Sequence, residues 1–427
     1  MKIFGIGLLT VVTVPYEFEN CYIATILLLI NPVWIIDVGF QYSFLATLGL
    51  IVTLPILLKK WDSLPPTVAS VITVPIAVLP WIFPLQLFHF GTVATYGIII
   101  NILATPFAIL IIIGGIFSGL AGLIISSLGE TIALLLSYLT QILISLVSGL
   151  NKLPGSYLFF GKLTLWQLIS IYSLIIFVWQ FSKGKQYWKL VLFCAIALII
   201  IPITYKQLTL RQITVFATKE TSVILIQNRG QVTLINCGTQ DTIRYTILPF
   251  LQQEGISKLD NAIALKSDNE WDYLHTKAPI KTLFYLPKLD RIINDFPDLE
   301  SVSKQRISSD LTFIQNQSLT IKQSHPFLLT INISNKQWGI LNYPTQILPS
   351  IPSELREIDI LLWSGKEISR SWLAQLNIES AIAVTNKISN DLKQQINQNQ
   401  VNLYITGKDG AIEWTPAGGL EARFNKF

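Results

Sequence analysis

The sequence predicts a polytopic α-helical membrane domain over residues 1–204, followed by a water-soluble α/β domain over residues 205–427. Residues 1–204 contain 8 Lys, no Arg and 5 acidic residues between long apolar runs, whereas the whole chain contains 31 basic and 26 acidic residues. From about residue 211 the pattern changes to short alternating runs typical of strands, interspersed with helical segments. A chain that is 51% hydrophobic and only 13% charged is neither an ordinary soluble enzyme nor a disordered protein.

Composition narrows the functional classes further. The net charge of +5 is divided almost evenly between the two parts, so charge alone does not indicate a nucleic-acid partner. Cys21, Cys194 and Cys237 are too few and too scattered for a disulfide framework or a C-x-x-C metal site. The class that remains is a membrane protein with an attached soluble domain.

Apolar segments of suitable length mark the candidate membrane helices, because a span needs about 20 mostly apolar residues. The segments cover residues 21–36, 41–58, 66–88, 93–126, 131–150, 164–181 and 188–204. Three prolines predict an irregular 66–88 segment, and Pro106 with four glycines predicts a break, a re-entrant piece or two short helices within 93–126. We expect about six to eight membrane helices. The stretch after Met1 is either a short first helix or a signal peptide. No small-residue cleavage pattern follows it, which disfavours the signal peptide.

Lysines near the segment ends indicate an orientation, since cytoplasmic loops are enriched in Lys and Arg. Lys59-Lys60 and the cluster at 183–189 are expected on the cytoplasmic side. The last span then leads outward and places residues 205–427 on the outer face of the plasma membrane. Lys152 and Lys162 fall in an outer loop under this scheme and favour the opposite orientation, which stays open.

Polar residues within the apolar segments are the candidate functional residues of the membrane half, because polar groups at membrane depth are costly. Pro32 and Gly39 interrupt helices, so Asp37 is predicted to cap the helix that follows. Gln41 lies four residues after Asp37 on one helix face, and Ser43 and Thr47 form another. These faces either line a water-filled path or only bind helices together. The polar residues that stand out are Asn31, Asp37, Gln41, Gln86, His89 and Asn101. The candidate signature residues are Asn31, Asp37, Gly39, Gln41, Ser43 and Asn101.

The same residues form a recognisable signature. The pattern Asn31-Pro32-x4-Asp37-x-Gly39-Phe40-Gln41-x-Ser43-Phe44-x-Ala46-Thr47, with Pro84-x5-Phe90-Gly91 and Asn101-x4-Pro106 further on, resembles the ComEC family, the inner-membrane channels of bacterial DNA uptake. The resemblance implies a multi-pass plasma-membrane component that carries single-stranded DNA during natural transformation. The implied partners are the DNA, the lipid bilayer, and a second copy or other competence-machinery proteins.

Family members usually begin with further helices and an OB-like soluble loop before this signature. The chain is therefore expected to be a truncated copy or half of a split one. The alternative function is a non-transporting paralogue or split subunit that assembles with a fuller channel protein. The absence of these N-terminal helices and of the OB-like loop favours this alternative, and the intact signature favours the channel function.

The soluble half alternates strand-like and helical segments, which suits a two-sheet core flanked by helices. Helices are predicted at 245–254, 370–376 and 387–396. Strands are predicted at 213–216, 223–226, 232–235, 259–265, 282–285, 312–315, 319–322, 327–333, 338–341, 359–363, 380–384 and 402–405.

The order of these elements resembles the metallo-β-lactamase-like domain that ends many ComEC-family chains, an α/β fold of αββα type. The matching pieces lie at 213–216, 234–238, 245–260 and 404–412, the last being a closing hairpin. Hydrolytic members of that fold bind two metal ions through His-x-His-x-Asp-His. The corresponding positions here are Ser267, Asn269, Trp271 and Asp272. The resemblance thus implies a scaffold whose metal ligands are altered.

A count of histidines leads to the same prediction without any alignment. The soluble half contains only His275 and His325, too few for an imidazole-rich two-metal site. We therefore expect no metal, no cofactor and no catalytic residue, and we disfavour an active nuclease. The acidic residues at 268–272 offer at most a weak Mg²⁺ site and are better explained as a solvated loop. Trp271, Trp338, Trp363 and Trp372 are candidates for stacking on single strands, with core packing as the default.

Overall fold

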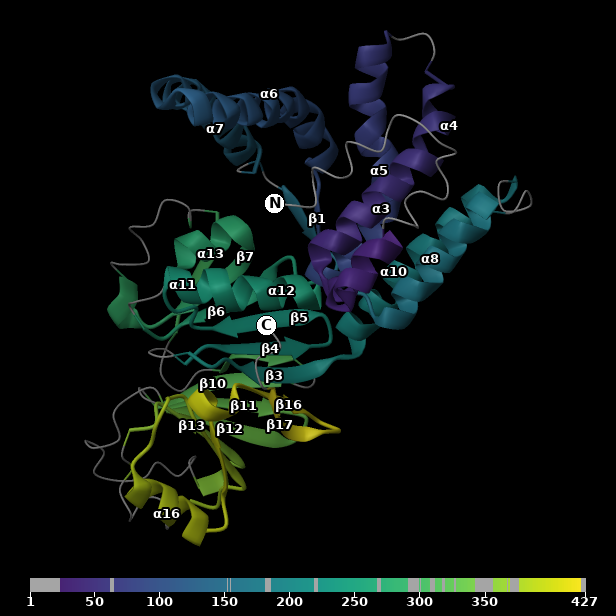
Figure 1. Ribbon diagram of the computed structural model, residues 1–427. Helices are drawn as coiled ribbons and strands as arrows, with labels where there is room; N and C mark the ends of the chain where they lie inside the picture. Colours follow the sequence, from purple (N-terminus) through teal and green to yellow (C-terminus); the bar gives the residue numbers. More distant parts are fainter. Residues whose placement is uncertain are drawn as a thin grey trace. The chain divides into compact units, whose positions relative to one another are not determined.

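The computed structural model describes residues 24–61, 65–151, 153, 155–180, 186–218, 222–266, 270–290, 299, 301–307, 312–316, 319–325, 328–341, 356–366, 368 and 376–423. The chain divides into two compact units (Figure 1). The first comprises Met1–Ile200 with Gln252–Gly255, and the second comprises Ile201–Leu251 with Ile256–Phe427. The expectations for the start of the chain, a signal peptide or a first helix before residue 24, lie outside the described residues.

The first unit is built from apolar helices. Among the described residues, four segments are long and apolar enough to cross a membrane: Val68–Phe90, Gly97–Ile124, Ser126–Asn151 and Trp188–Thr209. Two further apolar helices are shorter, with 15 and 16 residues. The chain is therefore a membrane protein. The elements are a helical segment at 24–30, η1 (Pro32–Ile36), α3 (Val38–Val52), α4 (Leu54–Leu58), α5 (Pro66–Phe90), α6 (Gly97–Ile124), α7 (Ser126–Asn151), α8 (Leu165–Gln180) and α10 (Trp188–Thr209).

Two expectations for these helices were wrong. The 66–88 segment is not irregular, because α5 runs unbroken through three prolines, and the 93–126 segment is not divided, because α6 is one helix that contains Pro106. A proline removes only one backbone donor from the helical ladder. In hydrocarbon every other backbone group still needs an internal partner, which favours continuing the helix.

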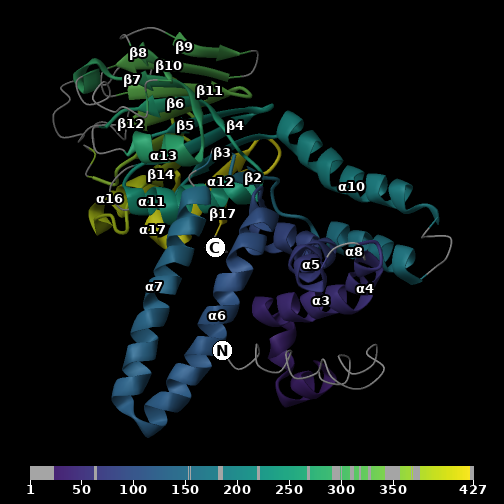
Figure 2. The same cartoon turned by 90° about the horizontal axis from the view of Figure 1, so that it is seen from above.

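Helices α6 and α7 form a long antiparallel hairpin (Figure 2). Their close approach depends on glycine: a Cβ on Gly129 would lie 2.6 Å from the Cα of Gly122. The Ser118 hydroxyl also donates to the Gly129 carbonyl at 2.8 Å. A short antiparallel ribbon of β1 (Thr92–Ala94) and β2 (Tyr157–Phe159) joins the chain just before α6 to the chain just after α7. Both ends of the hairpin are therefore held together at its base.

The second unit contains two mixed sheets. In the described residues one sheet has eight strands in the order β17-β16-β3-β4-β5-β6-β7-β8, and the other has seven in the order β15-β14-β13-β12-β11-β10-β9. Each sheet joins an antiparallel part to a parallel part. The strands of the first sheet are β3 (Arg211–Val215), β4 (Ile224–Asn228), β5 (Gln231–Ile235), β6 (Leu259–Ala264), β7 (Ile280–Tyr285), β8 (Ser303–Arg306), β16 (Ala411–Thr415) and β17 (Gly419–Arg423). Those of the second are β9 (Thr312–Asn316), β10 (Leu319–His325), β11 (Leu328–Ile333), β12 (Lys336–Leu341), β13 (Ile360–Trp363), β14 (Ser380–Ala383) and β15 (Asn402–Ile405).

Alternating side chains build two hydrophobic cores. On β13, Ile360 and Leu362 join the large core shared with the strands of the first sheet, whereas Leu361 and Trp363 join a smaller core with α16 (Asn390–Gln398). Figure 1 shows α11 (Gln240–Thr242), α12 (Leu248–Glu254) and α13 (Trp271–Lys277) over the outer face of the first sheet and α16 outside the second. The predicted αββα sandwich is thereby confirmed.

Most predicted elements of the soluble half agree with the structure to within a few residues. The helix predicted at 245–254 starts with a π-helical turn, η2 (Ile243–Ile247), and continues as α12. The closing hairpin predicted at 404–412 was wrong in position: that stretch links β15 of the second sheet to β16 of the first through α17 (Thr406–Asp409), and the hairpin is formed by β16 and β17. The predictions omitted α13 and β8, and the helix predicted at 370–376 lies outside the described residues except for Leu376.

Candidate functional site

The signature segment folds as two consecutive capped helices. Asn31 Oδ1 accepts a hydrogen bond from the Val33 N–H at 3.1 Å and thus starts η1. Asp37 Oδ1 accepts from the Phe40 N–H at 2.8 Å and starts α3, which confirms the predicted cap. Gly39 leaves room for that carboxylate, because a Cβ there would lie 3.1 Å from Asp37 Oδ1. Each cap satisfies a backbone donor that the first turn of a helix leaves unpaired.

Gln41 connects this segment to α5. Its Nε2 donates to the Ile35 carbonyl of η1 at 2.8 Å, and its Oε1 lies 2.9 Å from His89 Nε2 at the end of α5. An amide oxygen can only accept, so the hydrogen of this second bond is carried by His89 Nε2. Both ends of the Gln41 amide are therefore used, and the Gln41–His89 bridge ties the signature segment to a long span.

The other signature residues have separate places. The Ser43 carbonyl accepts from the Thr47 hydroxyl at 2.8 Å, so this pair acts within α3. Asn101 lies exposed on α6, and its carbonyl accepts from the Thr105 hydroxyl. The structure thus joins Asp37, Gln41 and the preceding η1 with His89, but it places Asn101 on another helix.

Two neighbours complete this region: His89, one of the polar residues that stand out in the sequence, and Tyr42, which sequence reasoning left out. His89 follows Gln41 by 48 residues, and only the fold brings them together. The Tyr42 ring packs against Phe90 with centroids 6.5 Å apart, and the Tyr42 hydroxyl is buried without a hydrogen-bond partner among the described atoms. A tyrosine in an apolar helix carries no sequence signal that distinguishes such a position from an interface anchor.

The degenerate metal-site positions are only partly described. Ser267 and Asn269 lie outside the described residues, as does Asp268. Trp271 begins α13 and is 1% exposed, within the large hydrophobic core. One carboxylate oxygen of Asp272 is buried without a partner among the described atoms. A core tryptophan therefore occupies one expected ligand position, and a single acidic side chain follows it.

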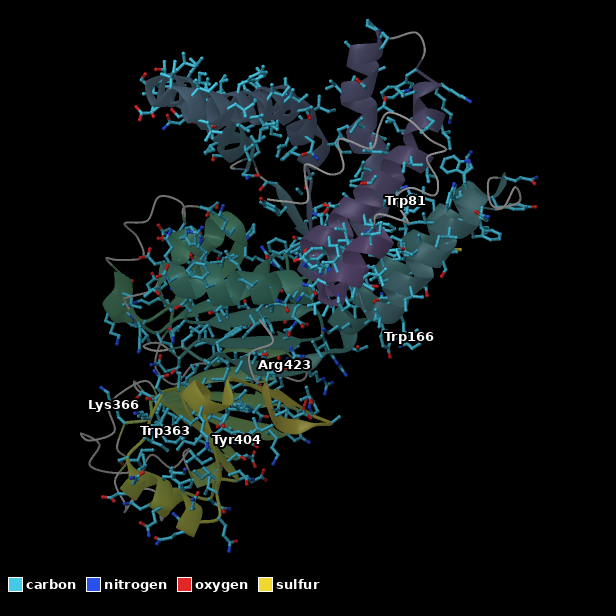
Figure 3. All side chains as sticks on the ribbon, viewed as in Figure 1. Trp81, Trp166, Trp363, Lys366, Tyr404 and Arg423 are labelled. Atoms are coloured by element: carbon cyan, nitrogen blue, oxygen red, sulfur yellow. The ribbon has the colours of Figure 1, made fainter. Side chains whose placement is uncertain are left out.

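Two further contacts near these positions have structural roles. His275 Nδ1 accepts from the Ile280 N–H at 3.1 Å, and its Nε2 lies 3.4 Å from the Ser301 hydroxyl. At the end of β13 the Trp363 indole donates to the Lys366 carbonyl at 3.1 Å, and the two residues lie close together in Figure 3. The side chain of His325 lies outside the described part. Within that part, no group of three His, Cys, Asp or Glu side chains is placed to hold a metal ion.

Core packing accounts for three of the four tryptophan candidates for base stacking. Trp271, Trp338 and Trp363 are all fully buried, so none presents a ring face to a strand. Trp372 lies outside the described residues.

Fold and site together define a membrane protein with a polar, hydrogen-bonded signature in its helical unit, followed by an αββα domain. Residues 20–185 match the model of the Competence family, described as Competence protein. The resemblance read from the signature is confirmed over this segment, and the match supports a role in the uptake of DNA during competence.

Other comparisons concern curated sequences and solved structures. No curated protein matches the chain in sequence. The chain is similar to Zn²⁺-bound PqqB from Methylobacterium extorquens, with 14% identity and a TM-score of 0.36 over 43% of this chain and 84% of that one. The metallo-beta-lactamase fold protein YhfI from Bacillus subtilis has 12% identity and a TM-score of 0.37 over 48% and 99%. A diphosphatase from the PhnP family has 15% identity and a TM-score of 0.34 over 49% and 100%.

Proposed function

We propose that this protein is a component of the inner-membrane channel through which single-stranded DNA enters a bacterium during natural transformation. The match of residues 20–185 to the Competence family supports the process. The observation that carries the proposal is the Gln41–His89 bridge, because polar and ionisable groups among apolar helices are costly and therefore mark candidate transport paths. The two caps at Asn31 and Asp37 fix the segment that presents Gln41.

Replacing Gln41 tests this proposal. Gln41→Leu leaves the Ile35 carbonyl and His89 Nε2 without their partner, which costs about 1–3 kcal/mol for groups away from water. We expect DNA uptake at equal protein levels to fall, because Gln41 no longer holds the signature segment against the end of α5. Ser43→Ala is the matched control on the same helix, because the carbonyl of Ser43 rather than its hydroxyl makes the bond with Thr47.

Transformation frequency with chromosomal and plasmid DNA is the measurement, made at equal protein levels. If disruption of the gene leaves DNA uptake unchanged, the protein is not a required channel component. The alternative function, a non-transporting subunit, would then be favoured. A Gln41→Leu chain that folds and transforms normally would restrict the bridge to a packing role.

The soluble domain is proposed to have no nuclease or other hydrolase activity. Two features support this proposal: a buried tryptophan stands at one expected ligand position, and His275 uses both ring nitrogens within the fold. Two-metal hydrolysis needs several imidazoles and carboxylates that converge on the cations. We expect the purified full chain to carry no stoichiometric Zn or Mn by elemental analysis and to leave labelled single-stranded DNA intact. Chelator-sensitive cleavage by the pure protein would contradict the proposal.

The soluble domain is further proposed to lie on the outer face of the plasma membrane. Helices α5, α6, α7 and α8 separate Lys59-Lys60 from the lysines at 183–189, so both clusters lie on one side if each helix crosses once. The excess of Lys makes that side cytoplasmic. Helix α10 then leads the chain outward.

A further inference from the structure

A hollow in the second unit begins where the last membrane helix ends. It has a volume of about 830 Å³ and is lined by residues 208–211, Arg229 and residues 415–417. All of these residues belong to the second unit. The hollow lies outside the signature segment and away from the positions at 267–272, so neither proposed function uses it.

Strand register explains why these segments meet. Arg211 opens β3 and pairs with Asn228 at the end of β4, and the Arg229 N–H donates to the Leu210 carbonyl at 2.9 Å. On the other side, β16 runs antiparallel to β3 with Trp414 opposite Ile213, so Pro416 comes next to Arg211. The β4–β5 turn and the β16–β17 turn therefore stand on either side of the chain as it leaves α10.

The lining combines two cations with apolar walls. Arg229 is exposed on its turn, and Arg211 donates through Nη1 to the Ser334 hydroxyl at 3.1 Å. The lining segments contain no acidic residue, and the Glu421 carboxylate lies beside Gly418, one residue beyond them. Leu208, Leu210, Pro416 and Ala417 provide the apolar surface. A planar guanidinium is suited to bidentate hydrogen bonding with a phosphate.

The position along α10 sets the level of the hollow in the membrane. Helix α10 is one of the spans and ends at Thr209. Tyr205 and Leu208 in its last turns are 69% and 65% exposed, which suits side chains that face lipid near the bilayer surface. Because Arg211 follows the last residue of this candidate span by two positions, a bilayer crossed by α10 would have its lipid headgroups at the level of Arg211.

We propose that this hollow binds the headgroup phosphate of an anionic phospholipid. The two arginines hold the phosphate while Leu208 and Leu210 contact the first acyl carbons. A bound single strand is disfavoured because strand-binding grooves rely on aromatic stacking, and the lining segments include no aromatic residue. The bound lipid would hold the soluble domain at a fixed height above the bilayer.

Binding of short-chain lipids to the full-length protein in uncharged detergent tests the proposal. Native mass spectrometry would follow titrations with dioctanoyl phosphatidylglycerol, dioctanoyl phosphatidylcholine, inorganic phosphate and an oligothymidylate. We expect the glycerol lipid to bind at least tenfold more tightly than the choline lipid. Equal binding of the two lipids, or competition by inorganic phosphate at the lipid's own concentration, would overturn the lipid assignment.

Charge-removing variants locate the binding site. Arg211→Gln and Arg229→Gln should each weaken binding of the glycerol lipid about fivefold, as expected for roughly 1 kcal/mol per basic residue at a membrane surface. Arg244→Gln, an exposed arginine outside the lining, is the matched control and should bind as wild type. Ala417→Glu brings a negative charge to an exposed turn position without disturbing the core, so it keeps the test valid if Arg211→Gln fails to fold. Unchanged lipid binding in Arg229→Gln and Ala417→Glu, or loss of oligothymidylate binding alone, would refute the proposal.

Discussion

At the scale of single residues, Asp37 shows how one carboxylate can satisfy both local geometry and a membrane environment. It accepts from the Phe40 N–H at the start of α3, and Phe40 is a buried residue of the first unit. An unpaired N–H in a water-poor setting costs more than the same group at a soluble helix end. The cap is therefore sufficient reason for a charged residue between two apolar runs.

Substituting Asp37 separates capping from charge. Asp37→Ala removes the acceptor and should lower the free energy of unfolding by about 1 kcal/mol, within the 0.5–2 kcal/mol known for N-caps. Asp37→Asn keeps an oxygen at the same place and should retain both stability and DNA uptake. Denaturant unfolding in detergent and transformation frequency provide the two readouts. A stable Asp37→Asn protein with poor uptake would show that the charge itself is required.

The sequence predicted the residues of this site better than their contacts. Asn31 and Asp37 could be placed because helix caps depend on neighbours three residues away. The Gln41–His89 bridge could not, since its partners are separated by a turn, α4 and nearly all of α5. The burial of Trp271 could not be predicted either, because the alignment of a position with a metal ligand does not indicate whether its side chain packs into a core.

At the scale of elements, helix packing explains where the local rules failed. Prolines and glycines predicted breaks in α5 and α6, but the apolar surroundings keep the backbone helical. Gly114 serves packing instead, because a Cβ there would lie 2.6 Å from Leu136 Cδ2 of α7. In the soluble unit β8 was missed because Ser303–Arg306 is polar, unlike the alternating strands that sequence patterns detect.

The crossing of α6 and α7 can be tested at Gly129. Gly129→Ala places a methyl group 2.6 Å from Gly122 Cα, and the helices must separate, at a cost of about 1–3 kcal/mol. Gly119→Ala is the matched control on α6, where a Cβ meets no atom within 4 Å among the described contacts. That control should be neutral or stabilising by up to about 1 kcal/mol, since alanine favours helix. Thermal unfolding in detergent compares the two, and equal melting temperatures would argue against a glycine-dependent crossing.

At the scale of the whole molecule, the path of the chain through the bilayer links its two units. The ribbon of β1 and β2 holds both ends of the α6–α7 hairpin together, so in the proposed topology the hairpin crosses the membrane and returns to the same side. Helix α8 has 16 residues, a length of about 24 Å, which a locally thinned bilayer accommodates. Counting α8 as a crossing returns the chain to the side of Lys59-Lys60 before α10 begins.

The proposed path of the chain through the bilayer predicts on which side of the membrane a reporter protein fused to a given residue will lie. Alkaline phosphatase fused after Arg423 should be active, because that enzyme needs the oxidising outer compartment, whereas a fluorescent protein fused there should stay dark. The same reporters placed after Lys60 should give the opposite pair of results and serve as the matched control. Phosphatase activity at Lys60 with fluorescence at Arg423 would invert the whole molecule, and the lysines at 152 and 162 would then mark the cytoplasmic side. Activity of one reporter at both sites would instead mean an even number of crossings from α5 to α10 inclusive, and would identify α8 as a helix that does not span the bilayer.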